Sequence, residues 1–386
     1  MLIRVIKKIV VYIYIGLKNI FHLSFFISTV LLFVTYYSSY LHPNSFILLP
    51  LLSLLFPVFL FLNILWILFF AFSFHLKRLI VAVLIQLFFL NDIQNFYAIN
   101  WKEKPQHSEN TLSVLSFNVK LFDLYNWQNN HLTRQEIMEY LKNNPADIMC
   151  FQEFYTSEDS NDFNNLQELK KLFPNYYFHS EYFVTLRQND HWGLLTISRY
   201  PIIKTSVIEF NNAKNNGCII STIAFQKDTI QVINLHLQSY SLFKKKKWRP
   251  HQKPDDENFF EALDSTAKGK NLIDKIYQNN NLKTQQAESI LRIVKENPYP
   301  TLIVGDFNDI AHSYLMRQLK KQHLKDAFAE KGNGFGFTYH DKIYLRIDYI
   351  FHSEHFKVLD FITENNKDTK HLSDHYPIRC LLELKK

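Results

Sequence analysis

The sequence predicts an α/β fold in which two mixed β-sheets pack face to face with helices outside, preceded by an N-terminal membrane anchor. Residues 1–100 are strongly apolar and hold a single acidic residue, Asp92, beside six basic ones. From Leu112 onward, short apolar runs alternate with polar loops and a few amphipathic stretches, as in strands with interspersed helices. The 386 residues therefore divide into an anchor at 1–100, a linker at 101–110 and a domain at 111–386.

The anchor is predicted to hold about three transmembrane helices. A helix needs about 20 apolar residues to cross a bilayer, and two runs meet that length, Ile20 to about Tyr40 and 46–72. A third run, 79–90, is short and needs residues 91–99 to complete a crossing, and the alternative is a re-entrant or interfacial segment. The apolar region is too long for a cleaved signal peptide.

Basic residues in the short loops predict the orientation of the anchor. Four basic residues precede the first span, and Lys77 and Arg78 lie between the second and the third, whereas the loop at 42–45 holds no Lys or Arg. The positive-inside rule then places the N-terminus in the cytoplasm and the domain after residue 100 outside it, in a multi-pass protein of the cell membrane. If the third segment does not cross, the domain stays in the cytoplasm.

The elements of the domain follow from the spacing of its apolar residues. The runs at 192–202 and 217–225 are expected to be adjacent strands, and 241–282 is a polar insertion that is expected to be partly helical. The predicted strands are 112–118, 146–153, 192–202, 217–225, 230–239, the start of 301–309, 346–353 and 375–384, and the predicted helices are 132–143 and 284–295.

The stretch Thr301–Asp309, TLIVGDFND, is the clearest single motif. Its first residues suit a buried strand, and the strand period of two points Asp306 and Asn308 to one side and Phe307 to the other. Gly305 permits a close backbone approach or a bulge where the polar pair emerges. A carboxylate and an amide there could hold a water and a phosphate oxygen. Taken alone, the motif is better explained as turn chemistry after a strand.

The same pattern, an apolar strand that ends in polar residues, recurs across the domain. Together, these carboxylates, amides and two histidines would line one site at the ends of the strands. Such a site suits phosphoester chemistry, because its hard oxygen ligands favour Mg²⁺ or Mn²⁺. Each residue also has an ordinary structural explanation as a turn cap, a solvated edge, a core histidine or an ion pair. Five predicted strands end in such groups and a cluster precedes the last strand: Asn118, Glu153, His236, Asp306 with Asn308, Asp348, and Ser373-Asp374-His375.

Eight short motifs occur in the order found in one superfamily. By these motifs, residues 111–386 resemble the endonuclease/exonuclease/phosphatase (DNase I-like) superfamily of nucleases, sphingomyelinases and inositol phosphatases. The resemblance implies a four-layered α/β sandwich and Mg²⁺-dependent phosphoester hydrolysis, and the N-terminal spans mark a membrane-anchored subgroup. The motifs are SFNV, FQE, GLLTISRYPI, NLHLQS, GDFND, GFGFTYH, RIDYIF and LSDHYPI, between residues 116 and 378.

The resemblance implies which residues hold the metal. Glu153 matches the principal ligand of the family, and Asn118 and Asp374 match residues that assist it. Lys120 departs from the pattern, because some nucleases carry an acid at this position. This departure puts a second metal ligand there in doubt.

The resemblance also implies catalytic roles. Asp306 and Asn308 match the pair that positions the attacking water and the phosphate. His375 matches a histidine held by a buried carboxylate, here Asp348, which would raise its basicity and fix its orientation. His236 matches a histidine that contacts phosphate or assists the leaving group in DNase-like and sphingomyelinase-like members. In abasic-site endonucleases an aromatic residue serves there instead.

Charge and cysteine content say little about the substrate. The net charge of +7 falls to +2 for the 37 basic and 35 acidic residues after residue 100, so the pI of about 9.0 is poor evidence for nucleic-acid binding. Cys150, Cys218 and Cys380 lie in apolar runs and are expected to be buried and free. The run 244–247 suits a solvated face, a nucleic-acid contact or an anionic-lipid contact. Arg199 could meet phosphate.

The predicted function is hydrolysis of phosphodiesters by a membrane-anchored, nuclease-like enzyme that needs Mg²⁺ or Mn²⁺. One alternative is a phospholipid head-group hydrolase of the sphingomyelinase or phosphoinositide type. Another is a catalytically inactive membrane-binding module. The presence of every polar residue implied by the resemblance argues against this alternative. The expected partners are a nucleic-acid or phospholipid substrate and the lipid bilayer, and no motif indicates a protein partner.

Overall fold

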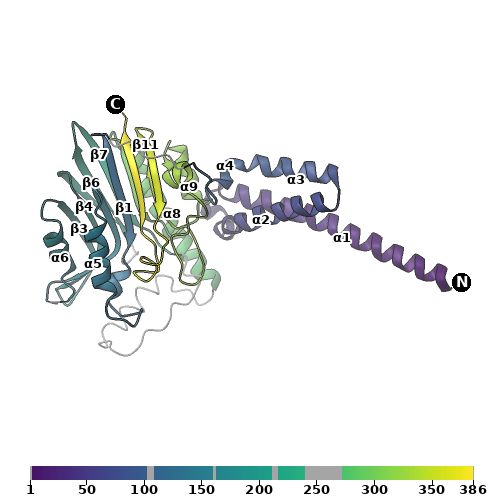
Figure 1. Cartoon of the computed structure of the whole chain (residues 1–386), viewed down its shortest axis with the longest axis horizontal. Coiled ribbons are helices and arrows are strands. Elements are labelled where there is room, and N and C mark those ends of the chain that lie inside the picture. Colours follow the sequence, from purple (N-terminus) through teal and green to yellow (C-terminus); the bar gives the residue numbers. More distant parts are fainter. Residues whose placement is uncertain (1, 102–107, 160–161, 211–215, 240–271, 386) are drawn as a thin grey trace. The chain divides into compact units, whose positions relative to one another are not determined.

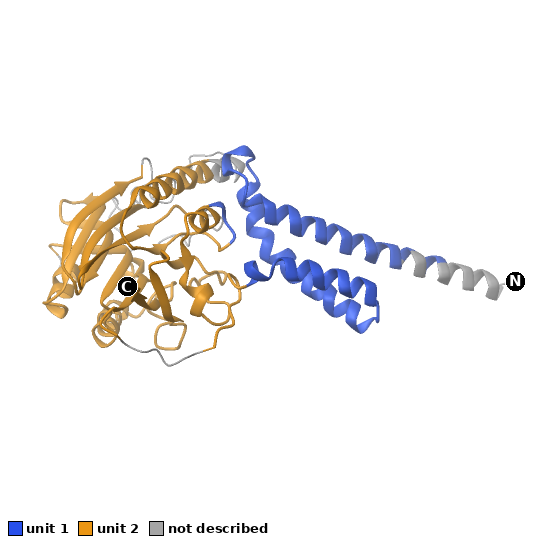
Figure 2. Ribbon diagram, turned by 90° about the horizontal axis from the view of Figure 1, so that it is seen from above, with its two compact units in different colours: residues 1–93, 312–314 blue, residues 94–311, 315–386 orange. Residues whose placement is uncertain are grey.

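The computed structural model describes residues 2–101, 108–159, 162–210, 216–239 and 272–385. The chain forms two compact units (Figure 2). One comprises Met1–Ile93 with His312–Tyr314, and the other comprises Gln94–Ala311 with Leu315–Lys386. Most of the predicted insertion at 241–282, including the run Lys244–Lys247, lies outside the described residues.

The larger unit contains two six-stranded mixed sheets (Figure 1). The first sheet has the order β11-β12-β1-β2-β4-β3, and the second has the order β5-β6-β7-β8-β10-β9. Strands of the first sheet are β1 (Thr111–Asn118), β2 (Ile148–Ser157), β3 (Tyr177–Leu186), β4 (Asp190–Ser198), β11 (Phe356–Thr363) and β12 (Ile378–Leu384). Strands of the second are β5 (Ile202–Glu209), β6 (Gly217–Phe225), β7 (Asp228–His236), β8 (Thr301–Asp306), β9 (Lys325–Asp326) and β10 (Asp348–His352).

Helices cover the outer faces of the two sheets. On the first sheet, α5 (Thr133–Asn143) and α6 (Asn165–Leu172) bury Ile137 and Leu169 among residues of β1 and β2. On the second, α8 (Leu272–Glu296) and α9 (Tyr314–Lys321) bury Ile290 and Leu319 against β7 and β8. This arrangement confirms the predicted α/β fold of two packed sheets with outer helices. The unit also contains η2 (Lys120–Asp123) and α10 (Ala327–Lys331).

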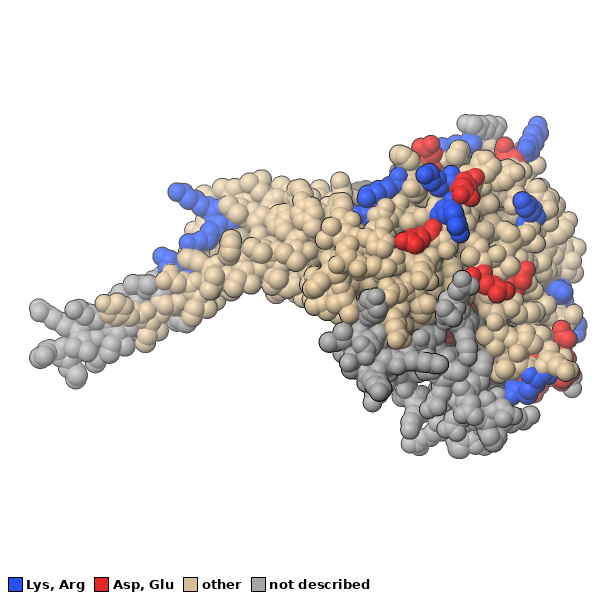
Figure 3. Space-filling model, turned by 180° about the vertical axis from the view of Figure 1, so that it is seen from behind, with Lys and Arg blue, Asp and Glu red and all other residues tan. Residues whose placement is uncertain are grey.

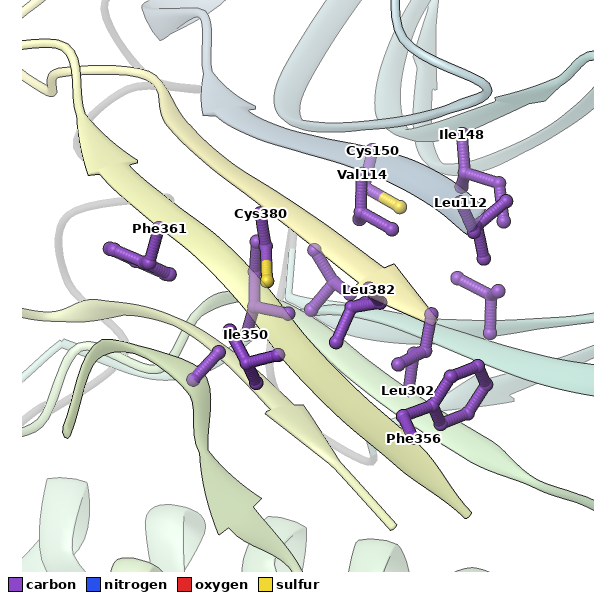
Figure 4. Close-up of a cluster of buried hydrophobic side chains, with 14 of the residues drawn as sticks. Leu112, Val114, Ile148, Cys150, Leu302, Ile350, Phe356, Phe361, Cys380 and Leu382 are labelled. Carbon is purple, nitrogen blue, oxygen red and sulfur yellow. The ribbon is translucent and has the colours of Figure 1, made fainter. Parts of the chain in front are cut away.

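A third core fills the space between the sheets (Figure 4). It joins Leu112 and Val114 of β1 to Leu302 of β8 and Ile350 of β10. All of these side chains have 0% exposure, and burying each stabilises the fold by about 1.5–3 kcal/mol. The three cysteines are buried and free, as predicted.

One predicted strand pairing is wrong. The runs 192–202 and 217–225 are not adjacent strands, because the chain changes sheets within the first of them. Residues up to Ser198 belong to β4 in the first sheet, and Ile202 begins β5, which pairs with β6 in the second. Pro201, which cannot donate a backbone hydrogen bond, lies at the point of change.

The smaller unit contains α1 (Leu2–Ser38), η1 (Pro43–Ser45), α2 (Leu49–Phe72), α3 (Leu76–Phe88) and α4 (Leu90–Ile93). Two stretches are long and apolar enough to cross a membrane, Lys18–Ser38 and Leu49–Phe72. The expected third span is a helix of 13 residues, and at 1.5 Å per residue it covers about 20 Å of a hydrocarbon core about 30 Å thick. Alone, α3 is therefore too short for a full crossing. On the face shown in Figure 3, basic side chains gather at one end of these helices.

Aromatic contacts fix how these helices run. Phe21 of α1 stacks on Phe69 near the end of α2, and Tyr36 of α1 meets Phe56 early in α2, so the two helices are antiparallel. Phe89, directly after α3, meets both Tyr36 and Phe56. The chain thus returns through α3 towards the level of the α1–α2 loop.

Candidate active site

The period of two along each strand decides where the polar side chains point. In β1, Leu112 and Val114 face the core between the sheets, whereas Phe117 faces the core under α5. Asn118 shares the parity of Leu112, so it points towards the opposite sheet. The same parity directs three more predicted residues to the inter-sheet face: His236 of β7, Asp306 of β8 and Asp348 of β10.

Strand pairing brings these residues to one end of the sandwich. The parallel pair β7 and β8 places His236 opposite Asp306 at the end of both strands. Asp348 is the first residue of β10, not the end of a strand as predicted. Because β10 runs antiparallel to β8, its first residue also lies opposite Asp306. Gly305 permits the close packing here, since a Cβ on it would lie 2.1 Å from the carbonyl oxygen of Leu235.

A bulge in β2 delivers Glu153 to the same place. Phe151 and Phe154 both lie in the outer core, and the pairing of β2 with β4 shifts register between them. Two residues instead of one therefore lie between these outward side chains, and Glu153 adopts a left-handed φ of 47°. Gln152 points between the sheets, where its Nε2 donates to Oδ1 of Asn234 at 2.7 Å. The bulge thus turns Glu153 towards the mouth.

Asp306 is the centre of the cluster. Its Oδ2 accepts from Nδ2 of Asn118 at 3.1 Å and lies 3.6 Å from Nε2 of His236 and 3.8 Å from Nε2 of His375. The residue is 1% exposed. Burial, reinforced by the negative charge of Asp348, raises the pKa of Asp306 to about 6. Asp306 is therefore a more basic carboxylate than usual, and it is surrounded by the amide of Asn118 and two imidazoles.

His375 is held by Asp348. Its Nδ1 lies 2.9 Å from Oδ2 of Asp348, which leaves Nε2 directed at Asp306. Burial opposes protonation of this imidazole, but the carboxylates of Asp348 and Asp306 outweigh burial and raise the pKa of His375 to about 10. The imidazole is therefore held as a cation beside two carboxylates, in a fixed orientation. Oδ1 of Asp348 is buried and has no hydrogen-bond partner among the described residues.

Asn308 is fixed beside Asp306 by its own backbone. It has a left-handed φ of 50°, its N–H donates to Oδ1 of Asp306 at 2.8 Å, and its Nδ2 donates to the carbonyl of Leu237 at 2.9 Å. Lys283 of α8 supports this turn: its Nζ donates to the carbonyl of Asn308 at 2.7 Å and lies 3.3 Å from the carboxylate of Asp309. Sequence reasoning missed Lys283. Its only signal is a basic residue on a helix directly before β8.

Of the residues predicted to hold a metal, Glu153 and Asn118 lie together. Nδ2 of Asn118 is 3.4 Å from Oε1 of Glu153, which in turn is 3.7 Å from Nε2 of His236. Asp374 is occupied differently, because its Oδ2 forms an ion pair with Nζ of Lys120 at 2.8 Å. Burial opposes ionisation of Asp374, but Lys120 and His375 outweigh it and lower the pKa of this carboxyl.

Two groups of residues could hold a divalent cation. Besides Glu153 with Asn118, ligand atoms of Asp306, Asp348 and His375 lie within 4.8 Å of one another. To bind an ion in the second group, His375 would have to lose its proton, and the neighbouring carboxylates oppose that loss by raising its pKa. The carboxylate of Glu153 suits a hard divalent ion. The amide of Asn118 would have to turn its oxygen towards such an ion, because Nδ2 faces Glu153 and Oδ1 accepts from the backbone N–H of Lys120. Glu153 is also open to solvent, with a side chain that is 27% exposed.

Arg199 lies far from this cluster. Its guanidinium is 3.5 Å from Oδ1 of Asp147, and Asp147 precedes the β2 residue Ile148, which pairs with Val114 in the first half of β1. Asn118 lies four residues beyond Val114, about 13 Å along the strand at about 3.3 Å per residue. The expectation that Arg199 could meet phosphate at this site is wrong, because the sheet places the arginine at the opposite end.

Comparison with known families agrees with this geometry. Residues 115–375 match the model of the Endonuclease/Exonuclease/phosphatase family. Residues 18–96 match a second model, described as a domain of unknown function. No curated protein is similar enough to the chain to count as a match.

Two solved structures of this family show the same fold. The chain is similar to an endonuclease/exonuclease/phosphatase family protein from Leptotrichia buccalis C-1013-b, with 17% identity, a TM-score of 0.50, and coverage of 71% of this chain and 100% of that one. A Bacteroides vulgatus protein of the same description has 17% identity, a TM-score of 0.52, and coverage of 71% and 99%. D. rerio TDP2 complexed with single strand DNA product has 16% identity, a TM-score of 0.45, and coverage of 71% and 99%.

Proposed function

The chain belongs to the endonuclease/exonuclease/phosphatase family and is therefore a metal-dependent phosphoesterase, and on this premise we propose that it is a membrane-anchored, nuclease-like hydrolase of phosphodiesters. The observation that supports this proposal best is the environment of Asp306. Two histidines and two asparagines surround one buried carboxylate at an open end of the sandwich. A phosphodiester needs such a set, because its charge must be balanced while protons are moved.

In this proposal, Glu153 and Asn118 hold the metal ion. The donors would be the carboxylate of Glu153 and the amide oxygen of Asn118, once that amide has turned its oxygen towards the ion, and such donors favour Mg²⁺, or Mn²⁺ in its place, over zinc. When bound, the ion supplies Lewis acidity towards a phosphate oxygen. Asp374 is proposed to assist only indirectly, since its carboxylate already pairs with Lys120.

The residues of the chain itself carry the proton movements. Asp306, with its raised pKa, accepts a proton from a water that the Asn308 amide helps to orient. The oxygen of that water bonds to phosphorus as the bond to the leaving oxygen breaks. His375, kept cationic by Asp348, donates to the phosphate, and His236 lies within reach to protonate the leaving oxygen. The products are a phosphomonoester and an alcohol.

The substrate class is proposed on charge and tethering. Net charge beyond residue 100 is +2, which is a weak field for holding a duplex. A tether to the bilayer would raise the effective concentration of lipid head groups at the site. The matched family supports phosphodiester hydrolysis of the nuclease type, and the charge and the tether make a phospholipid head group the second candidate. The intact polar set argues against a catalytically inactive binding module.

A substrate panel with metal control tests this function. Purified full-length chain is incubated with single-stranded DNA, duplex DNA, RNA, sphingomyelin vesicles and phosphoinositide vesicles, each with Mg²⁺, Mn²⁺ or excess chelator. We expect cleavage of at least one phosphodiester that is lost on chelation and restored by either ion. Release of inorganic phosphate from monoesters alone, or hydrolysis that survives chelation, would contradict the proposal.

The helical unit is proposed to be a membrane anchor that leaves the catalytic unit outside the cytoplasm. Lys77 and Arg78 lie between α2 and α3, whereas the α1–α2 loop at 42–45 holds no Lys or Arg. Phe89 lies back against Tyr36 and Phe56. Although α3 is short, the chain after it thus leaves the helices near the uncharged loop, opposite the basic turn. Positive-inside orientation places that end outside.

Reporter fusions test this orientation. An enzyme reporter that is active only outside the cytoplasm is fused after Ser45, after Arg78 or after Lys386. We expect activity from the first and third fusions and none from the second, with all three found in the membrane fraction. A silent fusion after Lys386 beside an active one after Ser45 would show that α3 does not return, and would place the catalytic unit in the cytoplasm.

A further inference from the structure

Lys120 brings a positive charge into the group of carboxylates at the mouth. It lies two residues after the end of β1, and its Nζ lies 2.8 Å from Oδ2 of Asp374. The negative charge of Glu153 also acts on this ammonium. Lys120 therefore pairs with one carboxylate and lies in the field of the carboxylate proposed to hold the metal.

The backbone fixes Lys120 in this place. Its N–H donates to Oδ1 of Asn118 at 3.1 Å, and it opens a run of four left-handed residues that extends to Asp123. The ammonium also lies 5.3 Å from the ring centre of Trp127, within the range of a cation–π contact. The contacts with Asp374 and Trp127 thus hold the side chain, and the bond to Asn118 holds the backbone.

A second divalent ion cannot share Asp374 with this ammonium. An ion bound to the carboxylate would lie about 2.0–2.1 Å from its oxygen, and the ammonium is 2.8 Å from Oδ2. Such an ion and the Lys120 ammonium would repel each other, because both would contact the same carboxylate with little water between them. The lysine must leave before the ion can bind.

The ammonium is also available to a ligand. The side chains of Lys120 and Asp374 are 22% and 20% exposed, so the pair forms part of the open mouth. An ammonium has three N–H donors, and the ion pair with Asp374 directs one of them inward. The remaining donors can therefore meet an anion that enters from solvent.

We propose that the site takes one divalent cation and that Lys120 fills the place of a second, contacting the phosphate of the substrate with its ammonium group. The proposal rests on the proposed function, since it concerns the same site. It gives a function to the lysine that stands where some nucleases of the family carry an acid: its covalently attached charge replaces an exchangeable ion.

The count of bound Mn²⁺ tests the first half. Full-length protein in detergent is titrated with Mn²⁺, and free ion is measured by electron paramagnetic resonance. We expect one bound ion for the wild type, two for Lys120→Asp, and one for the control Lys204→Asp, an exposed lysine on β5. Two ions in the wild type, or one in a folded Lys120→Asp variant, would overturn the proposal. Absence of any bound ion in the wild type would instead contradict the proposed function.

Binding of inorganic phosphate tests the second half and does not depend on the aspartate variant. Lys120→Met keeps the length of the side chain and removes its charge. We expect the affinity of the Mn²⁺-loaded protein for inorganic phosphate to fall about tenfold, with the Mn²⁺ count unchanged at one and Lys120→Arg largely restoring it. Unchanged phosphate affinity in the folded Lys120→Met variant would refute the contact.

Discussion

Replacing His375 with alanine or Asp306 with asparagine is expected to lower turnover by about 10³–10⁴-fold, the upper range for loss of a general acid or base. His375→Ala removes the imidazolium that Asp348 holds at 2.9 Å, and leaves that carboxylate buried without its partner. Asp306→Asn keeps the shape of the side chain but removes the carboxylate that the two histidines and Asn118 surround. Turnover is measured on the best substrate of the panel at saturating Mg²⁺.

The folded state must be checked in both variants, because both residues are buried. Asp306 lies beyond the apolar part of β8, so we expect circular dichroism to remain unchanged and the melting temperature to shift by a few degrees. His371→Ala is the matched control, since this histidine is 43% exposed and pairs with Glu136 on the surface. If either active-site variant folds normally and turns over like His371→Ala, the catalytic assignment is wrong.

The alternation of residues in the sequence predicted which side of a strand holds the functional residues more reliably than it predicted which strands pair. Parity along β8 correctly separated Asp306 from Phe307, which lies in the core under α8. Parity is local, because it depends only on the alternation of neighbouring residues. The assignment of 192–202 to a single strand failed because a change of sheet at Pro201 is decided by tertiary packing.

The bulge at Glu153 shows a second limit of predicting side-chain direction from the alternation of residues. A regular strand from Ile148 would point Glu153 outward with Phe151, away from the site. The inserted residue reverses this direction, and nothing in FQEF distinguishes a bulged strand from a regular one. Its place at a predicted strand end, and then the resemblance to a family, identified Glu153 where the alternation of residues would have excluded it. The pairing of β2 with β4 supplies the physical reason.

Residues that act through others are the hardest to find from sequence. Lys283 lies on a helix, 23 residues before Asp306, and its role appears only when α8 packs beside the turn that follows β8. Likewise, the link from Gln152 to Asn234 joins two sheets whose strands are distant in sequence. Such residues have no motif of their own, because their partners are backbone carbonyls and buried amides.

Glu153→Gln is expected to weaken Mn²⁺ binding by at least about 100-fold and to reduce turnover by a similar factor at low metal concentration. The variant keeps the size of the side chain and removes the single negative charge proposed to bind the ion directly, a larger change than loss of an outer-shell partner, which costs about 10–100-fold. High Mn²⁺ should restore part of the activity. Glu158→Gln is the control, since Glu158 follows β2 but its side chain is 69% exposed.

The same titration separates the two possible metal positions. If the ion lies at Glu153 and Asn118, Asp348→Asn should reduce turnover through His375 and leave Mn²⁺ affinity within a few-fold of the wild type. If the ion lies among Asp306, Asp348 and His375, the pattern reverses: Asp348→Asn loses the ion, and Glu153→Gln keeps it. The carboxylates that raise the pKa of His375 argue for the first pattern, because the imidazole would have to lose its proton to bind an ion. Retained Mn²⁺ affinity in Glu153→Gln would move the metal to the buried trio and require another role for Glu153.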